Sequence, residues 1–147
     1  MSETIGVLVV DDHPLFRQGV VHSLGAEPGL AVVGQAASGE EALKLAQELM
    51  PDIVLLDISM PGWDGLVTAE RIATACPATA IVMLTVSEDP DKLLGAFRAG
   101  ARAYVLKGVS AQELARVVRA TAATATTKAK AKPGQRRPAA SEVECTA

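Results

Sequence analysis

The sequence contains little of what secreted, membrane-spanning or nucleic-acid-holding proteins depend on. Only two of its 147 residues are cysteines, Cys76 and Cys145, and they form no CxxC pair. A disulfide framework or a cysteine zinc site is therefore not expected. No apolar run approaches the roughly 20 residues of a membrane span, and Asp11 and Asp12 interrupt the apolar start as no signal peptide would allow. The net charge of −3 argues against binding nucleic acid or anionic lipid by charge alone. We expect a cytoplasmic protein with neither a membrane nor a DNA partner.

Charge and composition divide the chain into two parts. Residues 1–120 carry nine Lys or Arg and fifteen Asp or Glu, whereas residues 121–147 carry five and two. The second part consists largely of Thr, Ala and Lys, with Pro133, Gly134 and Pro138, and it has no Leu, Ile or Phe. Such a segment cannot bury enough surface to offset the entropy of ordering it. We predict one domain over residues 1–122 and a flexible, disordered tail over residues 123–147.

Five short apolar runs alternate with five segments of helical length. The runs are rich in Val, Ile and Leu and lack polar alternation, which is typical of strands buried on both faces of a parallel sheet. They cover Ile5–Val10, Leu30–Gly34, Asp52–Leu56, Ala80–Leu84 and Ala103–Leu106. Helix starts are indicated by Pro14, by capping boxes at Ser38 and Ser110, and by Asp64 and Asp89. This order predicts an α/β fold, a doubly wound parallel sheet with helices on both faces.

Chemically distinctive residues follow four of the predicted strands. Asp11 and Asp12 follow the first, Asp57 the third, Thr85 the fourth and Lys107 the fifth. In such sheets the ligand site lies outside the carboxyl ends of the strands. With the strand order 2-1-3-4-5, these side chains converge on one shallow cleft.

Three carboxylates in one cleft repel one another and require a counter-charge. Hard oxygen ligands in this number suit Mg²⁺. With a hydroxyl and an ammonium group beside them, they can hold a phosphoryl group during transfer to a carboxylate oxygen. Asp57 is the best candidate for the nucleophile, because it stands alone at its strand end and faces the Asp11–Asp12 pair.

This constellation resembles the receiver domain of two-component response regulators. The matching stretches are Val7–Asp12, Leu55–Gly62 with Asp64–Gly65, Met83–Thr85 and Tyr104–Gly108. The stretch Asp11–Gly19 further resembles the NarL/FixJ subgroup, many of whose members carry a LuxR-type helix-turn-helix domain after the receiver. The resemblance covers residues 4–122 and implies a flavodoxin-like sheet of five parallel strands in the order 2-1-3-4-5, flanked by five helices.

The resemblance also implies a role for each matching residue. Asp57 would accept a phosphoryl group from a sensor histidine kinase, and Lys107 would pair with the phosphoryl oxygens. Asp11, Asp12, Asp57 and the backbone carbonyl of Ser59 would hold Mg²⁺. Thr85 would move towards the phosphoryl group and Tyr104 would rotate inward, which switches the surface of the fourth helix, fifth strand and fifth helix. Phosphorylation-dependent homodimers are a family-level expectation.

The chain departs from the family pattern at three places. Gly108 stands where the family often has Pro, and Val86 stands where a small residue is common and would narrow access to the phosphoryl group. The residues after 122 are also too few and too poor in apolar side chains to form a LuxR-type DNA-binding domain. The alternatives are therefore a transcription regulator whose output domain is missing, or a pseudo-receiver that acts by protein binding only.

The remaining candidates favour ordinary structural roles. His13 stands at a helix start and His22 has no partner at helical spacing, so neither is expected to be a phosphohistidine or a metal ligand. Trp63 is expected to be exposed beside the acidic cleft. Aspartyl phosphatases place a general acid two residues after the nucleophile, where this chain has Ser59. We therefore expect a signalling switch with only slow autodephosphorylation, and not a turnover enzyme.

Overall fold

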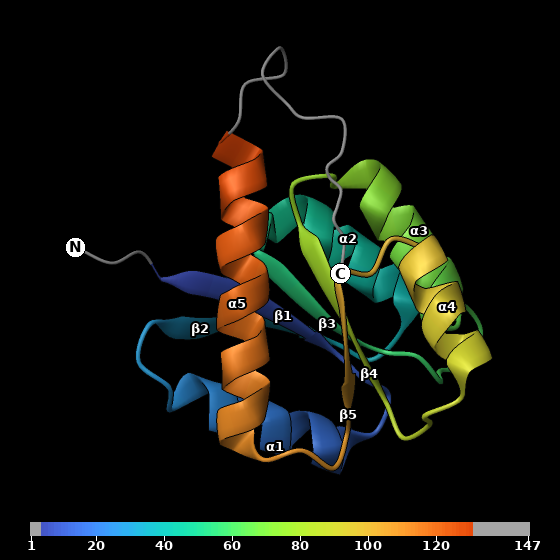
Figure 1. Cartoon of the computed structure of the whole chain (residues 1–147), viewed down its shortest axis with the longest axis horizontal. Helices are drawn as coiled ribbons and strands as arrows, with labels where there is room; N and C mark the ends of the chain where they lie inside the picture. The colour runs from blue at the N-terminus through green and yellow to red at the C-terminus, as the bar shows by residue number, and fades with distance from the viewer. Residues whose placement is uncertain (1–3, 131–147) are drawn as a thin grey trace.

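A computed structural model describes residues 4–130 of the chain. Strands and helices alternate along the whole of this range (Figure 1). The strands are β1 (Ile5–Val10), β2 (Leu30–Ala36), β3 (Ile53–Asp57), β4 (Ala80–Thr85) and β5 (Ala103–Leu106). The helices are α1 (Pro14–Gly25), α2 (Gly39–Leu49), α3 (Gly65–Ala75), α4 (Pro90–Arg98) and α5 (Ala111–Lys130).

The five strands form one parallel sheet in the order β2-β1-β3-β4-β5, which confirms the predicted fold. Val10 pairs with Leu56, and Asp57 pairs with Leu84, so neighbouring strands end at nearly the same level. Every residue of β3 and β4 is buried, because helices cover both faces of the sheet at these two strands. This explains why their sequences show no polar alternation.

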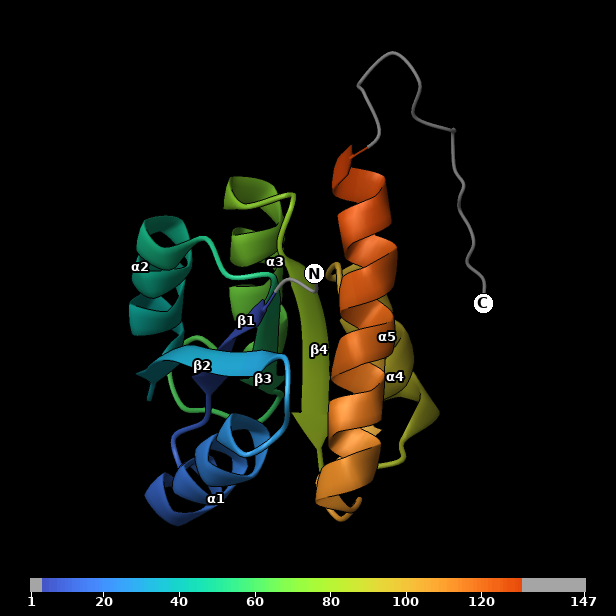
Figure 2. The ribbon, with the colours of Figure 1, turned by 90° about the vertical axis from the view of Figure 1, so that its left-hand side faces the viewer.

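Two apolar cores lie on opposite faces of the sheet. On one face Leu8 and Val54 pack with buried residues of α2, α3 and α4. On the other face Val9 and Leu55 pack with buried residues of α1 and α5. Figures 1 and 2 show the resulting three layers, with α1 and α5 on one side of the sheet and α2, α3 and α4 on the other. The strands are therefore sandwiched, and their carboxyl ends meet at one edge.

The predicted helix starts are present. The side chain of Ser38 accepts a hydrogen bond from the backbone N–H of Glu41, and that of Asp64 accepts one from Val67. Asp89 and Ser110 cap α4 and α5 in the same way. These bonds satisfy backbone donors that have no partner inside the helix. Each cap comes after the carboxyl end of a strand and directs the chain back over the sheet.

The helix α5 differs from the prediction of a disordered tail that starts at residue 123. It continues to Lys130, while residues 131–147 lie outside the described range. Its last turns project past the edge of the sheet in Figures 1 and 2. The added stretch is composed of Ala, Thr and Lys, and it contains no Pro or Gly. Ala and Lys have high helix propensity, which favours continuation of the helix beyond residue 122.

Candidate functional site

The site is built around two buried carboxylates at the ends of adjacent strands. Asp11 directly follows β1 and Asp57 is the last residue of β3. Their exposed fractions are 0% and 1%. Because β1 and β3 pair in parallel up to Val10 and Leu56, both carboxylates arrive at the same edge of the sheet. This edge is the lower one in Figure 2, where α1 and the start of α5 also lie.

Short backbone contacts hold these carboxylates in place. Oδ1 of Asp11 accepts a hydrogen bond of 2.8 Å from the N–H of His13, and Oδ1 of Asp57 accepts one of 3.1 Å from Ser59. The segment after Asp57 is pressed against the start of α3. A Cβ atom on Gly65 would come within 2.6 Å of the carbonyl oxygen of Asp57. Glycine is therefore required there by close packing of backbone against backbone.

Lys107, one residue beyond β5, supplies the positive charge. Its Nζ lies 3.1 Å from Oδ2 of Asp11 and 3.3 Å from Oδ2 of Asp57. The side chain is only 14% exposed, and its Nζ also lies 4.6 Å from the centroid of the Phe16 ring. The backbone N–H of Lys107 donates to the carbonyl oxygen of Thr85, which fixes the level at which the lysine leaves the sheet.

The pKa of Asp57 is raised above its ordinary value. Burial is the largest cause, because it penalises the charged form, and the nearby Asp11 carboxylate adds to it. The hydrogen bond from Ser59 and the charge of Lys107 act in the opposite direction and lower the pKa. The pKa rises on balance, because the Ser59 hydrogen bond and the charge of Lys107 together do not offset burial and the Asp11 carboxylate.

Three carboxylate oxygens lack a hydrogen-bond donor within the described part of the chain. They are Oδ2 of Asp11, Oδ1 of Asp12 and Oδ2 of Asp57, and all three atoms are buried. Lys107 approaches two of them at ion-pair distance but without hydrogen-bond geometry. Buried acceptors of this kind require a counter-charge, and carboxylate oxygens are the ligands of hard divalent cations. The residues present therefore fit a divalent metal ion.

The predicted switch residues, Thr85 and Tyr104, share a partner. The hydroxyl of Thr85 is buried and accepts a hydrogen bond of 3.0 Å from the N–H of Ser87. The Tyr104 hydroxyl donates one of 2.8 Å to the carbonyl oxygen of the same residue. Ser87, which the sequence analysis did not single out, thus connects both side chains through the loop between β4 and α4.

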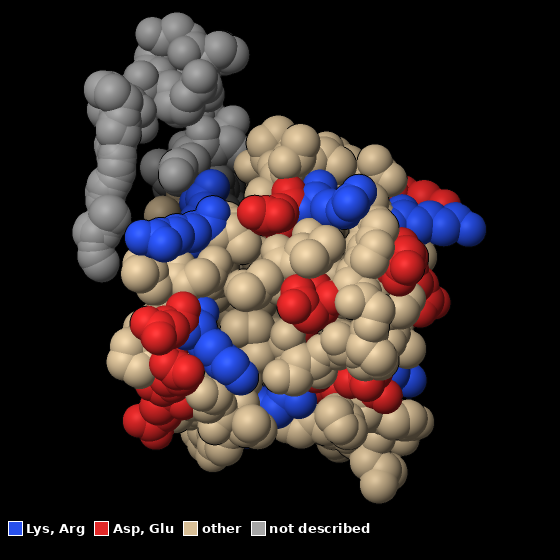
Figure 3. Space-filling view, turned by 90° about the vertical axis from the view of Figure 1, so that its right-hand side faces the viewer, with Lys and Arg blue, Asp and Glu red and all other residues tan. Residues whose placement is uncertain are grey.

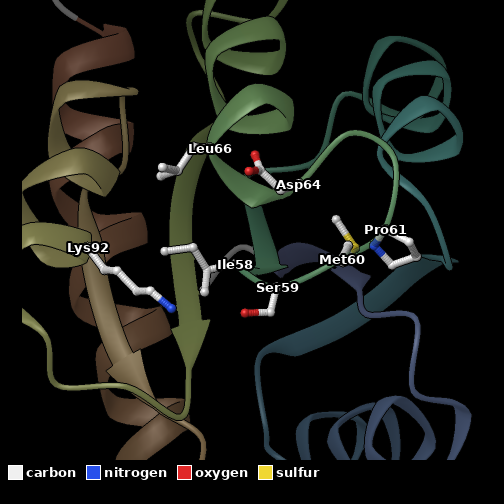
Figure 4. Close-up of a pocket in the computed structure, with 7 residues that line it drawn as sticks. All are labelled: Ile58, Ser59, Met60, Pro61, Asp64, Leu66 and Lys92. Carbon is white, nitrogen blue, oxygen red and sulfur yellow. The ribbon is translucent and has the colours of Figure 1, made fainter.

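A groove opens beside the carboxylates, between the loop after β3 and the first turn of α4. It has a volume of about 400 Å³. In Figure 4 the side chain of Lys92 extends from α4 towards Ile58 and Ser59, across from Asp64. Leu94 and Phe97 of α4 are exposed apolar residues. Figure 3, which faces α3 and α4, shows small groups of both charge signs separated by uncharged surface.

The structure brings together the residues that the sequence analysis placed in one cleft. Lys107 contacts both Asp11 and Asp57. Asp12 lies beside them, and its side chain is one of four that together offer metal ligands. Thr85 is adjacent through its backbone bond to Lys107 but turns its hydroxyl to Ser87.

Some expectations about neighbouring residues need adjustment. Val86 is 81% exposed, so in this conformation it packs over nothing in the site. Trp63 is half-buried beneath Arg71, whose guanidinium lies 4.5 Å from the ring centroid.

Three residues contact the site although nothing in the sequence placed them there. Phe16 lies against Lys107, and Arg17 donates a hydrogen bond to the carbonyl oxygen of Asp11. The ring of His13 turns to the carboxylates. No signal in a single sequence shows where the side chains of Phe16, Arg17 and His13 point.

Comparison with known proteins identifies the class of protein to which this fold and site correspond. The model of the response regulator receiver domain matches residues 7–119. The chain therefore belongs to the response regulator receiver domain family. No helix among residues 4–130 is both long enough and apolar enough to cross a bilayer.

Individual relatives are similar over the same region. The response regulator GacA of Pseudomonas aeruginosa is 44% identical over 115 residues, which cover 78% of this chain and 54% of the relative. The nitrate/nitrite response regulator NarL of Escherichia coli is 36% identical over 122 residues, covering 83% and 56%. The solved receiver domain of NarL from Mycobacterium tuberculosis superposes with a TM-score of 0.78 at 36% identity, covering 82% of this chain and 98% of that one. The chain thus spans about half the length of the curated relatives it matches.

Proposed function

We propose that this chain is a phosphorylation-controlled signalling switch whose Asp57 accepts a phosphoryl group from a sensor histidine kinase. The observation that carries the proposal is the Asp57 carboxylate, which lies at a strand end, 1% exposed, with Lys107 at 3.3 Å and two further acidic residues beside it. Membership of the receiver family supports the same assignment. A histidine kinase is the partner that this family implies.

In the transfer, one carboxylate oxygen of Asp57 attacks phosphorus in line and forms a P–O bond. The P–N bond of the phosphohistidine breaks, and the leaving imidazole keeps the electron pair and takes up a proton. Lys107 balances charge on the phosphoryl oxygens, as it now does on the carboxylates. The buried position of Asp57 keeps competing water away.

Asp11, Asp12, Asp57 and the backbone carbonyl of Ser59 are the residues that would hold Mg²⁺. Three of them supply the buried carboxylate oxygens that accept no hydrogen bond within residues 4–130. When bound, Mg²⁺ would supply positive charge that offsets the charge of the carboxylates and of the phosphoryl oxygens. This arrangement would leave each carboxylate with a cationic partner.

The response to phosphorylation would pass through Ser87. Movement of Thr85 towards the phosphoryl group would take its hydroxyl away from the N–H of Ser87 and would loosen the loop that Tyr104 also holds. Inward rotation of Tyr104 would then alter the surface of α4, β5 and α5, where Leu94 and Phe97 are exposed. A protein partner or a second phosphorylated copy would bind this surface. The chain would thus act in the cytoplasm as a switch and not as a turnover enzyme, and it would bind no DNA itself.

The test is phosphorylation with a small phosphodonor and Mg²⁺, followed by intact mass, for the wild type and Asp57→Asn. The wild type should gain one phosphoryl group, and both the variant and the chelator-treated wild type should gain none. Asp52→Asn, at the other end of β3, is the matched control and should be phosphorylated like the wild type. A folded wild type that takes up no phosphoryl group would instead indicate a pseudo-receiver that acts by binding alone.

A second candidate is that this chain represents the receiver part of a transcription regulator. Two observations favour it: relatives include the transcriptional regulatory protein LiaR of Bacillus subtilis, 40% identical over 116 residues, and the chain covers only 55% of that relative. Sequencing the reading frame past the codon for Ala147 tests it. A frame that continues into a DNA-binding domain would support this candidate, and a stop codon would favour a stand-alone switch.

A further inference from the structure

The imidazole of His13 lies against the acidic residues of the site. Although its side chain is 66% exposed, Nδ1 is 3.2 Å from Oδ1 of Asp11 and 3.4 Å from Oδ1 of Asp12. It also lies 3.9 Å from Oδ2 of Asp57. His13 precedes the first residue of α1, so the turn between β1 and that helix carries its ring back over the strand ends.

The distances from Nδ1 of His13 to the three carboxylate oxygens, 3.2, 3.4 and 3.9 Å, lie in the range of ligands around one ion. Donor atoms about 2.1 Å from an octahedral ion lie roughly 3.0 Å from adjacent donors and roughly 4.2 Å from opposite ones. One ligand atom from each of Asp11, Asp12, His13 and Asp57 lies within 4.8 Å of the other three. Independently, three carboxylate oxygens of this group are buried and accept no hydrogen bond within the described residues.

A nitrogen donor alters which ion such a site prefers. Mg²⁺ is a hard ion that takes oxygen ligands and retains water, whereas first-row transition ions accept imidazole readily. Mn²⁺ takes the same carboxylates as Mg²⁺. The change in the ratio of the two affinities when His13 is substituted therefore reports the contribution of the nitrogen.

We propose that His13 is a further ligand of this metal site and gives it a preference for a first-row transition dication over Mg²⁺. This inference rests on the metal site of the proposed function and adds to it a fourth side chain and an ion selectivity. The expectation from sequence, that a histidine at an exposed helix start has no metal role, considered the exposure but not the direction of the ring.

The experiment measures Mg²⁺ and Mn²⁺ binding by calorimetry for the wild type, His13→Asn and His22→Asn, without any phosphodonor. Asn is a favoured residue at a helix N-cap, and the backbone hydrogen bond from residue 13 to Asp11 remains in H13N, while only the ring contact of 3.2 Å to the same oxygen is lost. H13N should therefore fold normally. His22 is an exposed residue of the same helix, near its other end, and serves as the matched control. Circular dichroism verifies folding.

The wild type should bind Mn²⁺ more tightly than Mg²⁺, and H13N should reduce the Mn²⁺-to-Mg²⁺ affinity ratio about tenfold, the lower end of the effect of altering even outer-shell partners. H22N should keep the ratio of the wild type. Pulsed electron paramagnetic resonance of bound Mn²⁺ gives a second readout, since a ligating imidazole produces nitrogen modulation. The chain has only two histidines, so modulation that is lost in H13N and kept in H22N identifies the ligand.

The outcomes separate this inference from the proposed function. If the wild type binds both ions but H13N leaves the ratio and the nitrogen modulation unchanged, His13 is not a ligand, while the metal-dependent function stands. If the wild type binds neither ion, this inference and the metal part of the proposed function both fail.

Discussion

The two sides of the site are held together by different kinds of contact. On the side of β1 and β3, Asp11 and Asp57 are fully buried, and Gly65 lets α3 press on the backbone that follows Asp57. On the side of β4 and β5, the hydroxyl groups of Thr85 and Tyr104 are each held by one hydrogen bond to Ser87. Close packing admits few alternative arrangements, whereas one hydrogen bond contributes only about 1 kcal/mol net. The first side suits a fixed binding site and the second suits a part that changes conformation.

The same substitution should act oppositely on the two sides. Gly65→Ala places a Cβ against the backbone of Asp57 and Ile58, so we expect a loss of about 2–3 kcal/mol in the free energy of unfolding. Gly95→Ala in α4 meets only Leu66, at an ordinary 3.5 Å. It should stabilise the protein by about 0.5–1 kcal/mol, because Ala is the better helix former. Urea unfolding of both variants measures the difference. Equal stability of G65A and the wild type would show that the backbone of the loop after β3 can shift to accommodate the added Cβ atom.

The sequence was sufficient to predict the sheet, its helices and the residues at the strand ends. Buried parallel strands leave continuous apolar runs, and Asp11, Asp57 and Lys107 follow such runs directly. Whether a side chain at the site turns inward depends on rotamers and on contacts between distant segments. The shared partner of Thr85 and Tyr104 is an example, because Tyr104 and Ser87 are 17 residues apart. The continuation of α5 was missed because its sequence has few apolar residues other than alanine, although Ala and Lys have high helix propensity.

Removal of a buried charge tests the electrostatics of the fixed side. The pKa of Asp57 in the folded protein is raised from 3.8, mainly by burial. Between 3.8 and the raised value the folded protein binds more protons than the unfolded chain, so stability falls as the pH rises through this window. Asp57→Asn has no ionisable carboxyl group at this position, so it does not lose stability in this way. It should melt a few degrees higher than the wild type at neutral pH, and the gap should close below pH 3.8.

Thermal melts across pH measure this gap, and Asp52→Asn is the control. Asp52 is exposed, and it accepts a hydrogen bond from Gly6 that an Asn oxygen can also accept. The difference in melting temperature between D52N and the wild type should vary little with pH. A lower melting temperature for D57N at neutral pH would mean that Ser59 and Lys107 stabilise the ionised carboxylate by more than burial costs.

The smallest effect is expected on the other side of the site, from Tyr104→Phe. This change removes the hydroxyl that donates to the carbonyl oxygen of Ser87 and leaves the ring in place. The loss in unfolding free energy should be about 0.5–1.5 kcal/mol, because the carbonyl group is partly buried and loses its donor. Thr74→Val removes a hydroxyl with a similar bond, 2.9 Å to the carbonyl oxygen of Glu70, at an exposed position. It should cost less, since water can replace that bond.

The more informative measurement on Y104F is the rate of phosphorylation by a small phosphodonor. The Tyr104 hydroxyl bonds to Ser87 in the loop between β4 and α4, so the rate should stay near that of the wild type while binding of a phosphorylation-dependent partner changes. A large fall in the rate would show that the loop position governs the phosphoacceptor itself. The division between a fixed side and a responsive side would then fail, because one hydrogen bond at Ser87 would control both.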